Sequence, residues 1–235
     1  SRGFSVYFAC LHQPGDMIAY IRDRGFDVLE LTPSCLPMTP SHSADYKAWL
    51  QRSVEEDAND FLSKVDSSEW VIVDHYALDR EWESIIIGKL SCAILSIDDL
   101  NREHCSDIIL DQNLWPNISK RYSDCSATKL LGPEYALLRE SFSTLRDSPR
   151  DSISNQLLVF FGGTDPTNEC EKFILAANEF KRLPFNTILI TGRINPRFDA
   201  LIKLNQKSNV SIYKNLESFD LSLSNSKYAI GASGV

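Results

Sequence analysis

The sequence has no long apolar run, no closely spaced pair of cysteines and no excess of basic residues. Without a stretch of about 20 apolar residues, no segment is expected to cross a membrane. The net charge of −8 argues against a surface for nucleic acid or anionic lipid. The six cysteines contain no C-x-x-C pair, so a zinc site is not expected. We therefore expect a cytoplasmic protein with reduced thiols that binds neither nucleic acid nor membranes.

The composition is that of a globular protein with an ordinary apolar core. Hydrophobic residues make up 43% of the 235 residues and charged residues 24%. This length suits one large domain or two smaller domains of about 100–150 residues. Residues 146–155 contain Ser, Asp and Pro without hydrophobic periodicity, so they are the best linker candidate. We expect an N-terminal domain over residues 1–150 and a C-terminal domain over residues 151–235.

Short apolar runs alternate with helix-forming segments along the whole chain. The run Trp70–Asp74 stands between two expected helices, Ala44–Val65 and Leu78–Leu90, which is typical of a parallel strand buried on both faces. The alternation restarts after the linker candidate with an expected strand over Leu157–Phe161. Two such sets predict an α/β protein with two Rossmann-like domains, whose ligands bind at the carboxyl ends of the strands.

A glycine turn follows the expected strand Leu157–Phe161. Gly162 and Gly163 have no Cβ, so the backbone there can turn sharply and approach a ligand closely. A helix then starts either at Pro166, with Asp165 as its N-cap, or at Asn168, which has a glutamate three residues later as in a capping box. A strand, a glycine turn and a helix N-terminus in this order favour phosphate binding, although the same order also occurs as plain packing.

Polar residues follow three successive expected strands of the N-terminal half. They are Asp74, His75 and Tyr76 after the first, Asp98 and Asp99 after the second, and Asp111, Gln112 and Asn113 after the third. Since the carboxyl ends of parallel strands meet at one edge of a sheet, these groups together indicate a polar ligand such as a sugar.

Each of these groups also has an ordinary structural explanation. The aspartates could cap the helices that follow, and Tyr76 could pack on the surface. A metal at Asp98 and Asp99 is not favoured, because no D-x-D spacing or nearby cluster of histidine and aspartate supports it. We interpret His104 as a structural residue, and we expect His12 and His42 to lie in exposed loops.

Seven sequence blocks, in order over essentially the whole chain, closely resemble the UDP-sugar hydrolases of pseudaminic acid biosynthesis, a family of flagellin-glycosylation and spore-coat-polysaccharide enzymes. The resemblance implies two Rossmann-like domains facing across a cleft, as in the glycosyltransferase-B fold. It also implies a monomer that hydrolyses UDP-2,4-diacetamido-2,4,6-trideoxy-β-L-altropyranose to UDP and free sugar, without metal or cofactor. The blocks are Phe8-Ala9-Cys10, Trp49-Leu50-x-x-Ser53-x-x-x-Asp57-Ala58, Asp74-His75-Tyr76, Asp98-Asp99, Asp111-Gln112-Asn113, Gly132-Pro133-x-Tyr135-Ala136-Leu137-Leu138-Arg139 and Gly162-Gly163-Thr164-Asp165.

The resemblance also implies roles for single residues. Tyr76 would assist catalysis at the sugar, within a pocket formed by the polar residues that follow the three strands. The glycine turn would face the diphosphate, and the end of the chain would help to hold UDP. The implied binding residues are Asp74, His75, Asp98, Asp99 and Asn113 for the sugar, and Gly162, Gly163, Thr164, Asp165, Ser233 and Gly234 for UDP.

The chain departs from the family pattern at both ends. The opening segment of the family, with its first strand and a glycine-rich turn that carries a catalytic histidine, is absent, and so is a tail with an acidic residue for the ribose. None of the four histidines of this sequence matches the catalytic one. The resemblance therefore implies a chain truncated at both ends and inactive by itself. Two alternatives remain open: a glycosyltransferase of the same fold, and a non-catalytic fragment that binds sugar nucleotides.

Overall fold

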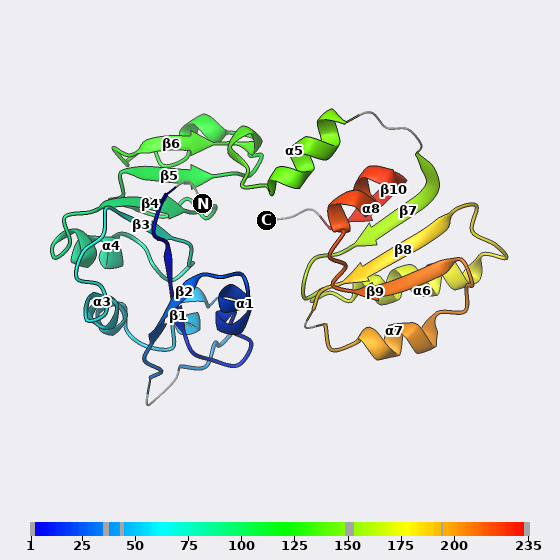
Figure 1. Cartoon of the computed structure of the whole chain (residues 1–235), viewed down its shortest axis with the longest axis horizontal. Coiled ribbons are helices and arrows are strands. Elements are labelled where there is room, and N and C mark those ends of the chain that lie inside the picture. Colours follow the sequence, from blue (N-terminus) through cyan, green and yellow to red (C-terminus); the bar gives the residue numbers. More distant parts are fainter. Residues whose placement is uncertain (1–2, 35–37, 43–44, 149–152, 194, 233–235) are drawn as a thin grey trace. The chain divides into compact units, whose positions relative to one another are not determined.

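The computed structural model describes residues 3–34, 38–42, 45–148, 153–193 and 195–232. The chain divides into two compact units, Ser1–Leu137 and Leu138–Val235 (Figure 1). In the described residues every strand pair is parallel. No helix in these residues is long and apolar enough to span a bilayer. The expected α/β class with parallel sheets is confirmed.

The described residues of the first unit form two separate parallel sheets. One contains β1 and β2, and the other contains β3, β4, β5 and β6 side by side in sequence order. The strands are β1 (Tyr7–Leu11), β2 (Asp27–Leu31), β3 (Trp70–Val73), β4 (Ala93–Ile97), β5 (Ile108–Asp111) and β6 (Thr128–Leu131). The helices are α1 (Ile18–Asp23), α2 (Tyr46–Trp49), α3 (Val54–Leu62) and α4 (Arg80–Ile87), with 3-10 turns η1 (Ile118–Lys120) and η2 (Pro133–Tyr135).

One apolar cluster connects both sheets of this unit with α3 and α4. Val71 and Val73 of β3 pack with Ile86 of α4, and Leu31 at the end of β2 belongs to the same cluster. The side chains that alternate with these valines point to the other face of β3, where Ile72 is 64% exposed. The expectation that this strand is buried on both faces is therefore wrong, because α3 and α4 pack on one face only.

The single long helix expected over Ala44–Val65 is also wrong; Ala44 itself lies outside the described residues. Helix α2 ends at Trp49, and Gln51 takes a φ of 60°, a left-handed conformation that interrupts a right-handed helix. Ser53 then begins α3 with a capping box, in which its hydroxyl accepts from the Glu56 N–H and the Glu56 carboxylate accepts from the Ser53 N–H. The local cap therefore divides this segment into two helices.

The second unit is a four-stranded parallel sheet in the order β10-β7-β8-β9 (Figure 1). Its strands are β7 (Ser154–Phe160), β8 (Asn186–Thr191), β9 (Val210–Lys214) and β10 (Ser226–Gly231). Its helices are α5 (Glu140–Asp147), α6 (Glu169–Glu179), α7 (Phe198–Leu204) and α8 (Phe219–Asn225). Because the unit boundary falls after Leu137, α5 groups with this unit, where it contacts α8.

Both faces of β7 are covered by helices. Leu157 and Val159 pack with residues of α6 and α7 in one buried cluster. Phe160 points to the opposite face, where its ring lies 5.1 Å from that of Phe219 on α8. Strand β7 also lies between β10 and β8 in the sheet, so it is an inner strand. The glycine turn follows from its carboxyl end.

Candidate functional site

Tyr76 lies in the loop between β3 and α4, against two aromatic side chains of α2. Its ring centroid is 4.7 Å from that of Tyr46 and 6.2 Å from that of Trp49. Tyr46 and Trp49 also contact each other edge to face at 4.9 Å. Aromatic pairs of this kind contribute about 0.5–1.5 kcal/mol beyond the burial of their area. The ring of Tyr76 is thus held in place by its neighbours, while Trp49 remains 39% exposed at the edge of the cluster.

Three residues that the sequence predicts for the site lie together in the structure: Tyr76, Asp99 and Asn113. The Asn113 amide Nδ2 donates to Asp99 Oδ2 at 3.0 Å. Burial of Tyr76 and the adjacent Asp99 carboxylate raise the pKa of the Tyr76 phenol to about 12. Asp99 Oδ1 is buried and has no hydrogen-bond partner among the described residues, so it can accept a further hydrogen bond. At neutral pH this cluster combines a phenol donor, a carboxylate acceptor and an amide.

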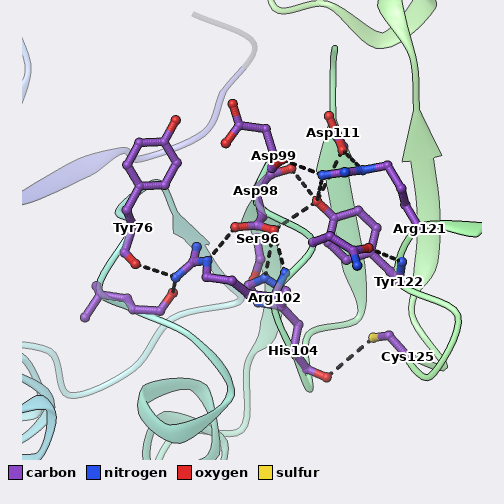
Figure 2. A network of polar contacts seen from close by, with 12 residues as sticks. Tyr76, Ser96, Asp98, Asp99, Arg102, His104, Asp111, Arg121, Tyr122 and Cys125 are labelled. Carbon is purple, nitrogen blue, oxygen red and sulfur yellow. Dashed lines mark hydrogen bonds and ion pairs between the residues drawn. The ribbon is translucent and has the colours of Figure 1, made fainter. Parts of the chain in front are cut away.

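A buried network of polar side chains lies next to this cluster (Figure 2). Asp98 follows β4 and is 2% exposed. Its carboxylate accepts from Arg102 Nε at 2.6 Å and from the Tyr122 hydroxyl at 2.9 Å. Burial by itself would raise the pKa of Asp98, but His104 and Arg102 outweigh it and hold this pKa well below its usual range. Asp98 is therefore a charged structural centre of this network; its place at the floor of a sugar site stays a prediction.

His104 extends the same network toward α4. Its Nδ1 lies 2.6 Å from Glu83 Oε1, and its Nε2 lies 3.6 Å from Asp98 Oδ2. Burial would lower the pKa of His104, but the two carboxylates raise it to about 9. Glu83 also accepts from the Ser96 hydroxyl at 2.6 Å. His104 is thus a buried imidazolium between two carboxylates, which fits the structural role expected for it.

A second set of contacts fixes the loop that carries Asn113. Asp111, at the end of β5, accepts from Arg121 Nε at 2.6 Å and from Trp115 Nε1 at 3.1 Å. The backbone N–H of Asn113 donates to Asp111 Oδ1 at 3.2 Å. The Arg121 guanidinium also stacks on the Trp115 ring at 4.3 Å and donates to the Asp99 carbonyl. One arginine thereby connects the loops after β4 and β5.

The sequence pattern does not indicate the side chains that hold this network, namely Glu83, Arg102, Arg121 and Tyr122. A usable signal exists for one of them, since Arg102 follows Asp98 by four residues. The others come from segments that only the fold brings together. Each of them contacts Asp98, Asp111 or His104.

The two remaining residues of the Asp74-His75-Tyr76 segment differ in environment. The Asp74 side chain is exposed. His75 is half-buried, and its Nδ1 accepts from the Ala77 N–H at 3.0 Å, which fixes the ring. Burial lowers the pKa of His75, so that its imidazole is neutral at pH 7. Within the described residues no cluster of histidine, cysteine, aspartate and glutamate is arranged to hold a metal ion.

In the second unit, the residue of the glycine turn with a left-handed backbone conformation is Gly162. Gly162 takes a φ of +83°, which favours glycine, whereas Gly163 has an ordinary φ and nothing within 4 Å of an added Cβ. The positive φ of the turn therefore falls on Gly162, one residue before Gly163. Gly163 and Thr164 are both exposed. Their backbone is accessible to a ligand.

Asp165 occupies the N-terminus of α6. Its carboxylate, 1% exposed, accepts from the Glu169 N–H at 2.7 Å and from the Cys170 N–H at 3.1 Å. Helix α6 begins at Glu169 with Asn168 as its N-cap, so the later of the two expected helix starts is the observed one. Two N–H groups that a phosphate could use are thus already bound by a carboxylate. A phosphate at this turn would contact the backbone before the helix.

Gly192, after β8, is a further residue of this region, and no sequence motif indicates it. An added Cβ at Gly192 would lie 1.7 Å from the Gly163 carbonyl oxygen. The Arg197 guanidinium donates to the Asp165 carbonyl, and its Nε is buried without a partner in the described residues. The loop after β8 thus packs directly against the glycine turn. Ser233 and Gly234, expected at the UDP site, lie outside the described residues.

No family model matches this chain. A curated relative, the UDP-2,4-diacetamido-2,4,6-trideoxy-β-L-altropyranose hydrolase of Campylobacter jejuni, is 29% identical over 153 residues. The match covers 63% of this chain and 53% of the relative, so the chain spans about half the length of the curated relative that it matches. Among solved structures, MurG of Acinetobacter baumannii is similar with a TM-score of 0.47 and 10% identity, covering 95% of this chain and 64% of MurG.

Proposed function

We propose that this chain contains the sugar-nucleotide site of a UDP-sugar hydrolase of pseudaminic acid biosynthesis. The observation that carries the proposal is the cluster of Tyr76, Asp99 and Asn113, in which Asn113 donates to Asp99 and Tyr76 lies beside it. The identity to the Campylobacter jejuni hydrolase supports the choice of substrate class. The proposed substrate is UDP-2,4-diacetamido-2,4,6-trideoxy-β-L-altropyranose.

The chemistry of the cluster suits this sugar. Its hydroxyl and acetamido groups both donate and accept hydrogen bonds, and the cluster offers both kinds of partner. Tyr76, neutral because its pKa is raised to about 12, would donate to an oxygen near the anomeric carbon. Asp99 Oδ1, which has no partner among the described residues, would accept from a hydroxyl or an amide N–H. We propose that Asp74 and His75 line the same pocket and that Asp98 supports its floor.

We propose that the diphosphate binds at the glycine turn of the second unit. The exposed backbone of Gly163 and Thr164 would donate to its oxygens, and the positive φ of Gly162 shapes the turn. The buried Asp165 carboxylate would hold the turn on α6 rather than contact the phosphate, since two like charges repel. The assignment of Ser233 and Gly234 to the UDP site stays a prediction.

We further propose that hydrolysis proceeds by attack of water at the anomeric carbon without a metal ion or cofactor. Such an attack needs a general base, which typically contributes 10²–10⁴-fold in rate. His104 is enclosed between Glu83 and Asp98, and His12 pairs with Asp16 at 2.9 Å. His75 is neutral and stands next to Tyr76 in the sequence. Because no histidine matches the base of the family, we propose that these 235 residues alone do not turn over the substrate at a useful rate.

The experiment is to incubate the purified chain with the UDP-sugar and follow UDP by phosphorus NMR. The proposal expects binding of the UDP-sugar with UDP release no faster than in buffer. Release that needs no acceptor sugar and disappears in His75→Gln would support the hydrolase but identify His75 as the base. Release only on addition of an acceptor sugar would contradict the hydrolase and indicate a transferase. The absence of any UDP-sugar binding would contradict the proposal as a whole.

A further inference from the structure

We propose that Arg102 is a positioning residue that holds Tyr76 at Asp99, through the loop after β3. This inference deepens the proposed function, because it concerns the geometry of the same sugar site. Arg102 is not expected to touch the substrate. It would act by fixing the loop backbone on which the Tyr76 side chain is carried.

The Arg102 side chain joins two loops that end neighbouring strands (Figure 2). Its Nη1 donates to the carbonyl oxygen of Tyr76 at 2.7 Å and to that of Leu78 at 3.1 Å, both in the loop after β3. Its Nε donates to Asp98 Oδ1 at 2.6 Å, in the loop after β4. A planar guanidinium offers several donors in fixed directions, so one side chain can set the distance between the two loops.

The Asp98 end of this connection is rigid. Asp98 Oδ2 also accepts from the Tyr122 hydroxyl at 2.9 Å and from the Arg102 backbone N–H at 3.1 Å. The Asp98 backbone N–H donates to the Leu110 carbonyl at 3.0 Å, which ties this residue to the end of β5. Since Asp99 is the next residue, the carboxylate beside Tyr76 is fixed to the same support.

The Tyr76 end has fewer independent restraints. Within the loop from Asp74 to Asp79, the Ala77 N–H donates to His75 Nδ1 and the Leu78 N–H donates to the His75 carbonyl. At the end of the loop, Asp79 caps α4 and the Arg80 N–H donates to the Glu103 carbonyl at 3.0 Å, several residues away from Tyr76. The aromatic contacts with Tyr46 and Trp49 hold the ring, not the loop backbone that carries it. Arg102 connects the Tyr76 carbonyl directly to the neighbouring strand end. The placement of the phenol beside Asp99 would therefore depend on Arg102.

Arg80 provides a matched control in the same region. It begins α4 and pairs with Glu103 at 3.5 Å, but its side chain is 63% exposed, whereas that of Arg102 is 17% exposed. Exposed ion pairs contribute little to stability. Arg80→Gln therefore removes the same charge as Arg102→Gln without removing a contact to the Tyr76 loop. Arg102→Lys keeps the charge beside Asp98 but lacks the fork that reaches both loops.

The test labels the chain with 3-fluorotyrosine and assigns the Tyr76 fluorine resonance with Tyr76→Phe. In Arg102→Gln and Arg102→Lys we expect this resonance to move toward that of free fluorotyrosine and to titrate at lower pH, because the phenol leaves Asp99. In Arg80→Gln we expect it to stay in place. We expect the Kd for the UDP-sugar to rise about tenfold in both Arg102 variants, because the sugar would lose about one hydrogen bond. We expect the Kd for UDP to stay unchanged.

The two readouts separate this inference from the proposed function. If the unchanged chain binds UDP and the UDP-sugar equally tightly, the proposed sugar site is contradicted. The fluorine resonance of Tyr76 then still decides whether Arg102 positions Tyr76. A Tyr76 resonance that is the same in the unchanged chain and in Arg102→Lys would overturn the positioning role. Should Arg102→Gln fail to fold, the lysine variant, which keeps the charge next to Asp98, gives the decisive spectrum.

Discussion

A Cβ added to Gly192 would stand 1.7 Å from the carbonyl oxygen of Gly163. The loop after β8 therefore passes the glycine turn with no room for a side chain. We predict that Gly192→Ala lowers the stability of the chain by about 1–3 kcal/mol and weakens UDP binding, because the turn must shift. Gly163→Ala is the control, since the space around Gly163 is open and its φ is ordinary. Thermal unfolding of both variants checks this, and equal melting temperatures would contradict it.

The second prediction concerns Gly163→Val. We expect the fold to remain intact, because nothing lies within 4 Å of a Cβ at this position. We expect UDP affinity to be lost, since a branched side chain on the exposed turn would block the approach of a phosphate to the backbone. Titration calorimetry with UDP measures the affinity, and circular dichroism verifies the fold. A variant that binds UDP as well as the unchanged chain would make the turn a purely structural feature.

The third prediction concerns Tyr76→Phe. The phenol is protonated at neutral pH, because burial and Asp99 raise its pKa to about 12, so it can act as a donor but not as a base. In a protein that contains this chain and releases UDP at a measurable rate, we expect kcat to fall about tenfold or more while KM changes little. A single donor near the anomeric carbon acts mainly in the transition state. Steady-state kinetics with an unchanged kcat would assign Tyr76 to packing against Tyr46 and Trp49.

The fourth prediction is a loss of stability at alkaline pH that depends on His104. Its pKa is raised from 6.5 to about 9, so its stabilising charge is fully present below pH 6.5 and is lost as the pH rises through 9. The contribution is on the order of 3 kcal/mol. We expect the melting temperature of the unchanged chain to fall between pH 7 and pH 10. His104→Gln should melt lower at pH 7 and show a weaker fall, and parallel curves for the two proteins would contradict this origin.

Much of the α/β pattern could be predicted from the sequence, because apolar runs and glycine turns are local signals. The strand before Asp74, the strand before Asp98 and the turn at Gly162 all follow from such signals. Strand β6 is not predicted by the pattern, since its four residues Thr128–Leu131 include a lysine and are too few to stand out. The interruption between α2 and α3 is not predicted from the sequence. The left-handed conformation of Gln51 depends on the C-cap of α2 at Leu50 and the N-cap of α3 at Ser53.

The site is predictable in part for a similar reason. Tyr76, Asp99 and Asn113 each lie within three residues after the end of a strand, and parallel strands bring their carboxyl ends to one edge. The four-residue spacing from Asp98 indicates one contact of Arg102, but its contacts to the loop after β3 depend on the fold. Arg121 could not be identified in this way, because its partners lie on other elements and only the fold brings them together. The sequence indicates that Asp165 can cap a helix. It does not indicate that the Asp165 carboxylate accepts hydrogen bonds from two N–H groups of α6.

In the proposed site, Tyr76, Asp99 and Asn113 bind the sugar of a UDP-sugar. The most direct measurement is saturation-transfer NMR of UDP-2,4-diacetamido-2,4,6-trideoxy-β-L-altropyranose with the purified chain, because it requires no turnover. We predict transfer to both uracil and sugar protons in the unchanged chain, and in the control Asn117→Ala, whose exposed side chain makes no cap hydrogen bond. In Asn113→Ala we predict that transfer to the sugar protons is lost while the uracil signals remain. Sugar signals that are as strong in Asn113→Ala as in the control would show that this cluster does not bind the sugar.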